Sequence, residues 1–323
     1  MKTAVDSQSK IPSLAIVVPC YNEQEMFEKT LAVLIGLTEK LIAINKISSQ
    51  SKIYFVDDGS ADRTWSLLEE SCTQYHQVVA IKLSRNRGHQ NALYAGLCET
   101  KEDLIVSIDA DLQDGPENIE YMVDEHKLGN EIVYGVRNKR DSDTLFKRFT
   151  AESFYRVMDK LGVDLVFNHA DFRLMSRRAL NSLLTYPESN LFLRGMVKKI
   201  GFQSSSIEYE RQAREAGESK YPLKKMIALA WNGITSFSTA PLRAITFLGM
   251  LSSFLSLWII AWVVGIKLFT DNAVPGWASI LVPLVFIGSV QLLCLGVIGE
   301  YLAKVYDEVK RRPRYQIDKI SGR

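Results

Sequence analysis

Two aspartates and a glutamine alternate along a stretch that directly follows an apolar run. Asp109, Asp111 and Gln113 come after Leu104–Ile108, and in an extended chain alternate side chains lie on one face. That face would present two carboxylates and an amide carbonyl, which are oxygen ligands that suit Mg²⁺ and Mn²⁺. A solvated acidic turn is the alternative for so short a motif. The spacing predicts a divalent-cation site if other polar groups gather nearby.

Three other polar clusters each follow a short apolar run. Residues 19–23 read Pro-Cys-Tyr-Asn-Glu, residues 57–60 read Asp-Asp-Gly-Ser, and residues 85–88 read Arg-Asn-Arg-Gly. In open α/β sheets, ligands bind outside the carboxyl ends of the strands. Any one of these clusters could be an ordinary turn, but four in succession predict one site at one edge of a sheet. The glycine signatures of a dinucleotide site and of an ATP-type phosphate loop do not occur in the sequence.

The apolar runs alternate with helix-like segments, which is typical of an α/β fold with right-handed βαβ units. The expected helices lie near 23–43, 62–75, 88–100 and 116–127. We therefore expect a mostly parallel sheet flanked by helices. The expected strands are Leu14–Val18, Lys52–Val56, Val78–Leu83, Leu104–Ile108, Glu131–Tyr134, Phe172–Met175 and Gln203–Glu210.

Two apolar stretches without charged residues stand near the end of the chain, at residues 244–266 and 277–299. Each exceeds the roughly 20 residues that cross a bilayer as a helix. The pair predicts a two-helix transmembrane hairpin, with two buried core helices as the alternative. Lysines and arginines flank its outer ends, which by the positive-inside rule places both termini and the N-terminal domain in the cytoplasm. Four scattered cysteines argue against a disulfide framework or a zinc site.

Taken in order, the motifs resemble those of family 2 glycosyltransferases with the GT-A (nucleotide-diphospho-sugar transferase) fold. Within that family the chain is most similar to the polyisoprenyl-phosphate glycosyltransferases, which include dolichol-phosphate mannose synthases and bactoprenol glucosyltransferases. The resemblance covers about residues 12–240, and a two-helix tail is typical of the bacterial glucosyltransferases. The matching residues are Val18–Glu23, Val56–Ser60, Asn86–Gly88, Asp109–Asp114, Asp171–Leu174 and Gly217–Tyr221.

The resemblance implies a role for each matching position. The nucleotide sugar would be bound by Pro19, Tyr21, Glu23, Asp57, Asp58 and Asp109. A Mg²⁺ or Mn²⁺ ion would be held by Asp109, Asp111 and Gln113. Because guanidinium and ammonium groups suit phosphate oxygens, donor and acceptor phosphates would be bound by Arg137, Arg148, Arg214 and Lys220. The residues expected to take part in catalysis are Asp111, Arg137, Asp171 and Lys220.

Asp171 stands where many family 2 enzymes place a catalytic base. The expected acceptor is a lipid phosphate, which is already mostly anionic at neutral pH because its second pKa is near 6. A base is then unnecessary, so Asp171 could instead orient the sugar or pair with Arg173. His89 and His169 stand beside the motifs, and we expect both to be structural.

The implied reaction is the metal-assisted transfer of a sugar to a polyisoprenyl (undecaprenyl) phosphate with inversion, and UDP-glucose is the favoured donor. GDP-mannose or a UDP-aminoarabinose derivative stays open as the donor, and so does a homo-oligomeric state. The chain lacks the Gln-x-x-Arg-Trp motif of polysaccharide synthases. An inactive nucleotide-sugar-binding scaffold is the alternative from another class. The expected partners are the donor, the lipid acceptor and the bilayer, without nucleic acid.

The chain is thus expected to have four parts. Residues 1–219 form a cytoplasmic catalytic domain. Residues 220–243 mix apolar residues with lysines and predict an amphipathic segment at the membrane surface, although a plain connecting helix is equally compatible. Residues 244–299 hold the hairpin, and residues 300–323 form a basic cytoplasmic tail.

Overall fold

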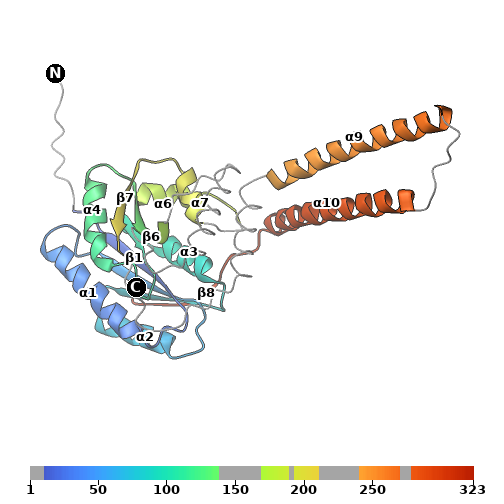
Figure 1. The fold of residues 1–323 in the computed structure, drawn as a ribbon. Helices are drawn as coiled ribbons and strands as arrows, with labels where there is room; N and C mark the ends of the chain where they lie inside the picture. Colours follow the sequence, from blue (N-terminus) through green and yellow to red (C-terminus); the bar gives the residue numbers. More distant parts are fainter. Residues whose placement is uncertain (1–10, 138–168, 189–192, 211–239, 270–277) are drawn as a thin grey trace, which may run out of the picture. The chain divides into compact units, whose positions relative to one another are not determined.

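The computed structural model describes residues 11–137, 169–188, 193–210, 240–269 and 278–323 (Figure 1). The chain divides into two compact units. One unit consists of Met1–Arg156, Asp164–Lys220 and Pro313–Arg323, and the other of Val157–Val163 and Tyr221–Arg312. The C-terminal residues therefore belong to the same unit as the N-terminal domain.

The first unit is built on a sheet whose described strands have the order β7-β5-β6-β4-β1-β2-β3-β8. The four central strands, β4, β1, β2 and β3, run parallel, and β7 runs parallel to β5. β6 and β8 are antiparallel to their neighbours, so the mostly parallel sheet is confirmed. The strands are β1 (Leu14–Cys20), β2 (Lys52–Asp57), β3 (Val78–Leu83), β4 (Leu104–Ser107), β5 (Ile132–Arg137), β6 (His169–Ser176), β7 (Ser204–Tyr209) and β8 (Ile317–Ser321).

Helices connect the parallel strands, as the alternating pattern predicts. Each of the four expected helical segments in the first half of the chain contains a helix within a few residues of its expected bounds. The described helices of this unit are α1 (Phe27–Ala43), α2 (Thr64–Gln74), α3 (His89–Glu99), the 3₁₀ turn η1 (Pro116–Asn118), α4 (Ile119–Lys127), α6 (Arg177–Leu184) and α7 (Leu193–Lys199).

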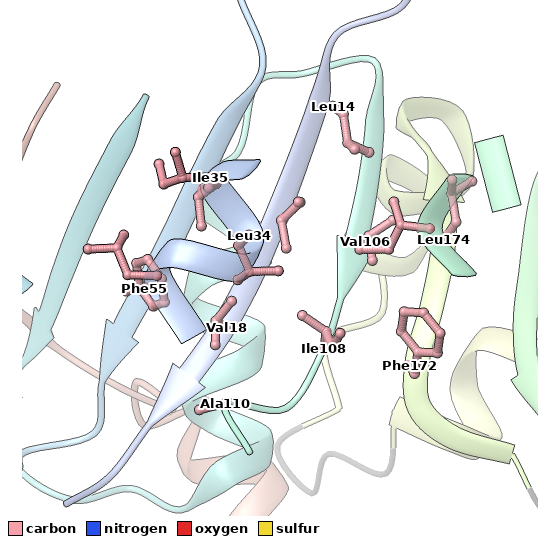
Figure 2. Close-up of a cluster of buried hydrophobic side chains, with 14 of the residues drawn as sticks. Leu14, Val18, Leu34, Ile35, Phe55, Val106, Ile108, Ala110, Phe172 and Leu174 are labelled. Carbon is pink, nitrogen blue, oxygen red and sulfur yellow. The ribbon is translucent and has the colours of Figure 1, made fainter. Parts of the chain in front are cut away.

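The apolar core of this unit includes one face of the central strands, and α1 contributes to it (Figure 2). Val18 of β1, Phe55 of β2 and Val106 of β4 are fully buried in this cluster together with Leu34 of α1. Burial of each such side chain contributes about 1.5–3 kcal/mol to the free energy of unfolding. This packing fixes the ends of β1, β2 and β4, where the polar clusters begin.

Helix α3 approaches the central strands through residues that alternate with those of the α1 side, because successive side chains on a strand point to opposite faces. A Cβ on Gly96 would stand 2.4 Å from the Val17 Cγ1 atom and 2.7 Å from the Val56 Cγ2 atom. Only glycine allows so close an approach of this helix. The approach brings the first residues of α3 to the same sheet edge as the strand-end clusters.

The C-terminal residues differ from the expected basic tail. Ile317–Ser321 form β8, which pairs antiparallel with β3 and closes that edge of the sheet. The Ser84 N–H donates to the Gln316 carbonyl at 2.9 Å, and Lys319 pairs with Glu69 of α2. The sequence alone gives a weak signal here, because β8 is short, carries two charged residues and lies far along the chain from its partner.

The second unit contains two long helices, α9 (Ala240–Phe269) and α10 (Ala278–Lys310). They include residues 244–266 and 278–299 of the two apolar stretches. Within the described residues, only Phe286–Lys310 is long and apolar enough to cross a membrane, and Pro241–Leu251 is a shorter apolar helix. The predicted transmembrane hairpin therefore stays a proposal, and residues 220–239 of the expected interface segment lie outside the described residues.

Candidate active site

Three of the four polar clusters are bonded to one another at the carboxyl ends of β1, β2 and β3. The Asp58 carboxylate accepts the backbone N–H groups of Arg87 and Gly88 at 2.7 and 2.8 Å. The Asp58 N–H donates to the Cys20 carbonyl at 2.9 Å. Since β4 lies parallel to β1 in the same sheet, the fourth cluster, which follows β4, lies at this edge too. The clusters therefore meet at one edge, as the sequence predicts.

The neighbouring acids Asp57 and Asp58 differ in what their carboxylates do. Asp58 uses both oxygens to hold the loop after β3, so its carboxylate has a structural use, and its contact with the nucleotide sugar stays a prediction. Asp57 accepts the Ser60 N–H at 3.2 Å through Oδ1, while its buried Oδ2 has no hydrogen-bond partner among the described residues. Burial raises the pKa of Asp57. A buried acceptor without a partner is costly, so Asp57 is the better candidate to bind a ligand's N–H or O–H group.

The loop that follows β1 presents one exposed aromatic ring. Its conformation is fixed by Asn22, which has a positive φ of 55°, and by the Thr64 hydroxyl, which accepts the Glu23 N–H at 2.9 Å. Tyr21 is 48% exposed and can offer its ring face to a flat base. Pro19, also expected to bind the nucleotide, is buried within β1.

The acidic segment after β4 is a turn, so the prediction of one extended face with three ligands is wrong. β4 ends at Ser107, and Leu112 has a positive φ of 55°. The Gln113 N–H donates to the Asp111 Oδ1 atom at 3.2 Å, and Gln113 is only 4% exposed. β4 ends before Asp109, and the chain then turns toward η1. Within this turn the side chains do not alternate between two faces as they would in an extended strand.

Asp109 and Asp111 nevertheless fit a divalent cation. Both are partly exposed, and the buried Asp109 Oδ1 makes no hydrogen bond within the described residues, although the His89 Nε2 atom lies 3.5 Å from it. Burial raises the pKa of Asp109 to about 6; His89 opposes this rise, while the carboxylates of Asp171, Asp114 and Asp111 add to it. A cation would offset this repulsion. No cluster of three His, Cys, Asp or Glu ligands occurs in the described ranges, which suits an ion that completes its shell with water and substrate phosphates.

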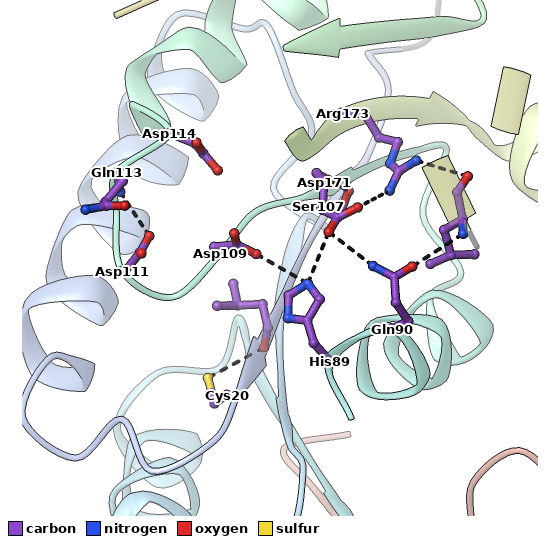
Figure 3. Close-up of polar contacts among 12 residues, drawn as sticks. Cys20, His89, Gln90, Ser107, Asp109, Asp111, Gln113, Asp114, Asp171 and Arg173 are labelled. Atoms are coloured by element: carbon purple, nitrogen blue, oxygen red, sulfur yellow. Dashed lines mark hydrogen bonds and ion pairs between the residues drawn. The ribbon is translucent and has the colours of Figure 1, made fainter. Parts of the chain in front are cut away.

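Asp171 is buried on β6, and both of its carboxylate oxygens are held (Figure 3). Oδ1 accepts the Arg173 Nη2–H group at 2.9 Å, and Oδ2 accepts the Gln90 Nε2–H group at 3.1 Å. The Ser107 hydroxyl donates to the Asp171 carbonyl at 2.5 Å. Of the alternatives that the sequence leaves open, the pairing with Arg173 is confirmed. A carboxylate held in this way is better suited to orienting a ligand than to accepting a proton.

His89 lies in the site and does not stand apart from it (Figure 3). Its Nε2 atom is 3.5 Å from the Asp109 Oδ1 atom and 3.4 Å from the Asp171 Oδ2 atom. The sequence suggests a purely structural role for His89 and does not single out Gln90. Both residues begin α3 directly after the Arg85–Gly88 cluster. The first turn of a helix that follows a strand-end motif is the signal that could have identified them.

Arg137, at the end of β5, pairs with a buried acid. Its Nε and Nη2 groups donate to the Asp114 Oδ1 atom at 3.2 and 2.9 Å, and the Tyr209 hydroxyl donates to the same oxygen at 2.7 Å. Burial and the charge of Asp114 raise the pKa of Tyr209. The Arg137 side chain stays 27% exposed, so it could contact a phosphate while keeping its bond to Asp114. The other predicted phosphate-binding residues, Arg148, Arg214 and Lys220, lie outside the described residues, and His169 begins β6 with a side chain that is not described.

The chain is similar to proteins of known family. A family model described as glycosyl transferase family 2 matches residues 15–184. The chain is 51% identical to the uncharacterized glycosyltransferase YkoT of Bacillus subtilis (strain 168), over 95% of this chain and 91% of that protein. It is 38% identical to the SfII prophage-derived bactoprenol glucosyl transferase of Shigella flexneri, over 95% of this chain and 97% of that protein. The mannosyltransferase PcManGT of Pyrobaculum calidifontis, solved with GDP-Man and Mn²⁺, is 14% identical with a TM-score of 0.45, over 94% of this chain and 86% of that chain. The chain belongs to glycosyl transferase family 2.

Proposed function

We propose that the chain transfers glucose from UDP-glucose to a polyisoprenyl phosphate, such as undecaprenyl phosphate, at the cytoplasmic face of the membrane. The observation that carries the proposal is the group of aspartates at one sheet edge. Within it, Asp57 keeps a buried carboxylate oxygen without a hydrogen-bond partner among the described residues, and the buried Oδ1 atom of Asp109 is approached by the His89 Nε2 atom at 3.5 Å without a hydrogen bond. The relatives named bactoprenol glucosyl transferase, at 36–38% identity, support the choice of sugar and acceptor.

The donor would lie across the ends of β1, β2 and β4. Tyr21 and Asp57 are suited to the base and ribose, because one offers a ring face and the other a hydrogen-bond acceptor. Asp109 and Asp111 would hold Mg²⁺ or Mn²⁺ against the diphosphate, with Gln113 fixing the turn. The ion, when bound, would stabilise negative charge on the leaving diphosphate. Arg137 would bind phosphate oxygens through its exposed part.

The acceptor brings its own nucleophile. A phosphate oxygen of the lipid forms the bond to the sugar C1 atom, and the bond from C1 to the donor diphosphate breaks, with its electron pair leaving on UDP. One displacement of this kind inverts the configuration at C1. Asp171, held by Arg173 and Gln90, would orient the sugar hydroxyls. No general base is needed, because the acceptor phosphate is already mostly anionic at neutral pH.

The long helices of the second unit would anchor the enzyme where its lipid acceptor lies. Large apolar side chains on both helices are exposed, including Trp258 at 66% and Leu292 at 73%. Apolar surface of this extent is expected to face lipid or another protein. A hairpin of 244–266 and 277–299 with both termini in the cytoplasm is the arrangement that the basic flanks support.

The test uses the purified full chain in nanodiscs with undecaprenyl phosphate and either Mn²⁺ or Mg²⁺. UDP-glucose, UDP-galactose, UDP-N-acetylglucosamine and GDP-mannose are offered separately, and the lipid-linked sugar is followed by mass spectrometry. We expect metal-dependent product from UDP-glucose. Product from another donor alone would keep the reaction class and overturn the sugar. Binding of a donor without any product would favour the scaffold alternative.

Two variants assign the activity to the proposed site. Asp111→Asn should lower turnover at least a hundredfold, because it weakens the hold on the cation and the diphosphate. Glu28→Gln removes an exposed carboxylate on α1 and is the matched control, so its turnover should equal that of the unaltered protein. Equal turnover by both variants would overturn the assignment of Asp111.

A further inference from the structure

The Asp171 carboxylate and the backbone at the start of α7 are bound by the same two side chains. Gln90 donates to the Asp171 Oδ2 atom at 3.1 Å, and its own Oε1 accepts the Leu193 N–H at 3.3 Å. Arg173 donates through Nη2 to the Asp171 Oδ1 atom at 2.9 Å and through Nη1 to the Leu193 carbonyl at 3.4 Å. These four bonds form a ring of side-chain and backbone groups, and Figure 3 draws them as dashed lines that start from Asp171, Gln90 and Arg173.

Burial adds a desolvation cost to the formation of this ring. Arg173 is 1% exposed, and it is among the largest side chains that the fold buries completely. Asp171 and Leu193 are also buried. A desolvated ion pair contributes little to stability by itself, since the cost of removing both charges from water offsets much of their attraction. Three elements far apart in the sequence, α3, β6 and α7, are therefore joined through a polar group whose stabilising value is small.

The ring fixes the direction of one carboxylate at the sheet edge. Each Asp171 oxygen has a donor on a different element, Arg173 on β6 and Gln90 on α3, so rotation of the carboxylate plane breaks at least one of these bonds. The His89 Nε2 atom also lies 3.4 Å from the Oδ2 atom that Gln90 binds. The Ser107 hydroxyl holds the Asp171 carbonyl and thereby the backbone of β6 against β4. This is the kind of second layer that an orienting group needs, because small rotations of such a group weaken its effect on the bound substrate.

We propose that Gln90 and Arg173 are positioning residues for sugar transfer: they aim the Asp171 carboxylate at the sugar and make its orientation depend on the start of α7. The inference rests on the proposed function. It deepens that function by assigning an effect on kcat to Gln90 and Arg173, which act through Asp171 and not by contact with the substrate. Leu193 takes part only through its backbone, so its side chain type is free to vary within the limits of packing. A displacement at the start of α7 would be transmitted to Asp171 through both residues.

A double-mutant cycle in the full chain tests the proposal. Gln90→Ala removes one donor to Asp171 and should lower kcat about tenfold, because the carboxylate loses one of the two bonds that fix its orientation toward the sugar. The KM for the donor sugar should change less than twofold, because Gln90 is not part of the nucleotide site. Asp171→Asn keeps the side-chain shape and an oxygen for Arg173. In the Asp171→Asn background, Gln90→Ala should lower kcat no further, since Gln90 acts through the carboxylate.

Equal losses from Gln90→Ala in both backgrounds would overturn the proposal, because a merely structural role does not depend on Asp171. Gln74→Ala, the same change at an exposed site on α2, is the control and should leave kcat unchanged. Lack of turnover by the unaltered protein with every donor would instead count against the proposed function.

Hydrogen exchange at α7 tests the same link without any turnover. Gln90→Ala should speed exchange of the Leu193 amide, because the acceptor of that N–H is lost. Asp171→Asn should speed it as well, since Gln90 loses the partner that holds it in place. Gln74→Ala should have no effect. Unchanged exchange in the Asp171→Asn protein would contradict the coupling of Asp171 to α7 whether or not the protein transfers glucose.

Discussion

Two arginine–aspartate pairs lie in the first unit of the chain, and they differ in how far the arginine side chain is exposed to water. Arg173 and Asp171 are 1% and 5% exposed, whereas Arg137 is 27% exposed and only its partner Asp114 is fully buried. Both pairs have a N–O distance of 2.9 Å, so the geometry alone does not separate them. Burial does: Arg173 cannot leave Asp171 without stranding a charge, while Arg137 can contact a second anion and keep its first. One arginine is built to hold a carboxylate, and the other can also receive a phosphate.

The largest expected effect comes from breaking the buried pair. Arg173→Met should lower the free energy of unfolding by about 3–5 kcal/mol, because it leaves the Asp171 charge without its buried partner. Thermal unfolding in detergent measures the loss. Adding Asp171→Asn should recover part of it, since the stranded charge is removed. Arg178→Met, on the exposed surface of α6, should cost less than about 1 kcal/mol. Similar losses from both arginines would show that burial does not distinguish them.

Replacing Arg137 should change the binding of UDP-glucose more than the stability of the fold. Arg137→Met should raise the KM for UDP-glucose about tenfold, because a charge-assisted contact to phosphate is lost. Its effect on unfolding should be smaller than that of Arg173→Met, since the Arg137 side chain is 27% exposed and a partly solvated ion pair contributes less to stability. Steady-state kinetics and thermal unfolding of the same preparations provide both values. Arg137→Lys should restore part of the binding, and an unchanged KM in Arg137→Met would remove Arg137 from the phosphate site.

A smaller change isolates Tyr209, the third residue bonded around the buried Asp114 carboxylate. Tyr209→Phe removes one donor to Asp114 and should lower the free energy of unfolding by about 1 kcal/mol. The edge-to-face contact of the ring with Phe172 at 5.5 Å stays in place, so the core should be intact. Turnover should stay within about twofold of the unaltered protein if Tyr209 only supports Asp114. A larger loss of turnover would mean that the hydroxyl contacts substrate.

The smallest expected effect has the opposite sign. Asp109→Asn should stabilise the metal-free protein at pH 8, because it removes one charge from a group of repelling carboxylates, and the midpoint of thermal unfolding should rise by about 1–3 °C. Burial raises the pKa of Asp109 to about 6, whereas an unfolded aspartate titrates at about 3.9, so the gain should be smaller at pH 5 than at pH 8 and should vanish only below about pH 4. Thermal unfolding with EDTA at both pH values tests this. A loss of stability at pH 8 would mean that the carboxylate has a structural use.

The central strands of the sheet are predictable from the sequence, and the edge strand β8 is not. Strands such as Leu14–Cys20 are buried on both faces, so they appear as continuous apolar runs with sharp ends. β8 gives no such signal, because it lies at an edge and pairs across a distance of more than 200 residues in sequence. The burial of Arg173 is equally hidden, since a charged residue within a strand predicts exposure; the sequence offers the pairing with Asp171 as one alternative, and the structure shows that the pair is buried.

The site is predictable to a similar degree. The strand-end clusters are found because βαβ topology places their ends together, whatever the details of each loop. The turn after β4 is not found, since a positive φ at Leu112 has no glycine to mark it. The sequence does not separate the roles of Asp57 and Asp58 either. Which of the two carboxylates accepts the backbone N–H groups of Arg87 and Gly88 depends on the folded positions of the two loops.

Metal-dependent binding of UDP-glucose is the most direct test of the claim that this sheet edge is a donor site. Titration calorimetry on the full chain with Mn²⁺, and again with EDTA, would measure the affinity in unaltered, Asp111→Asn and Glu28→Gln proteins. We expect binding in Mn²⁺ that is lost with EDTA, lost in Asp111→Asn and kept in Glu28→Gln. Undiminished Mn²⁺-dependent binding by the Asp111→Asn protein would place the donor site elsewhere.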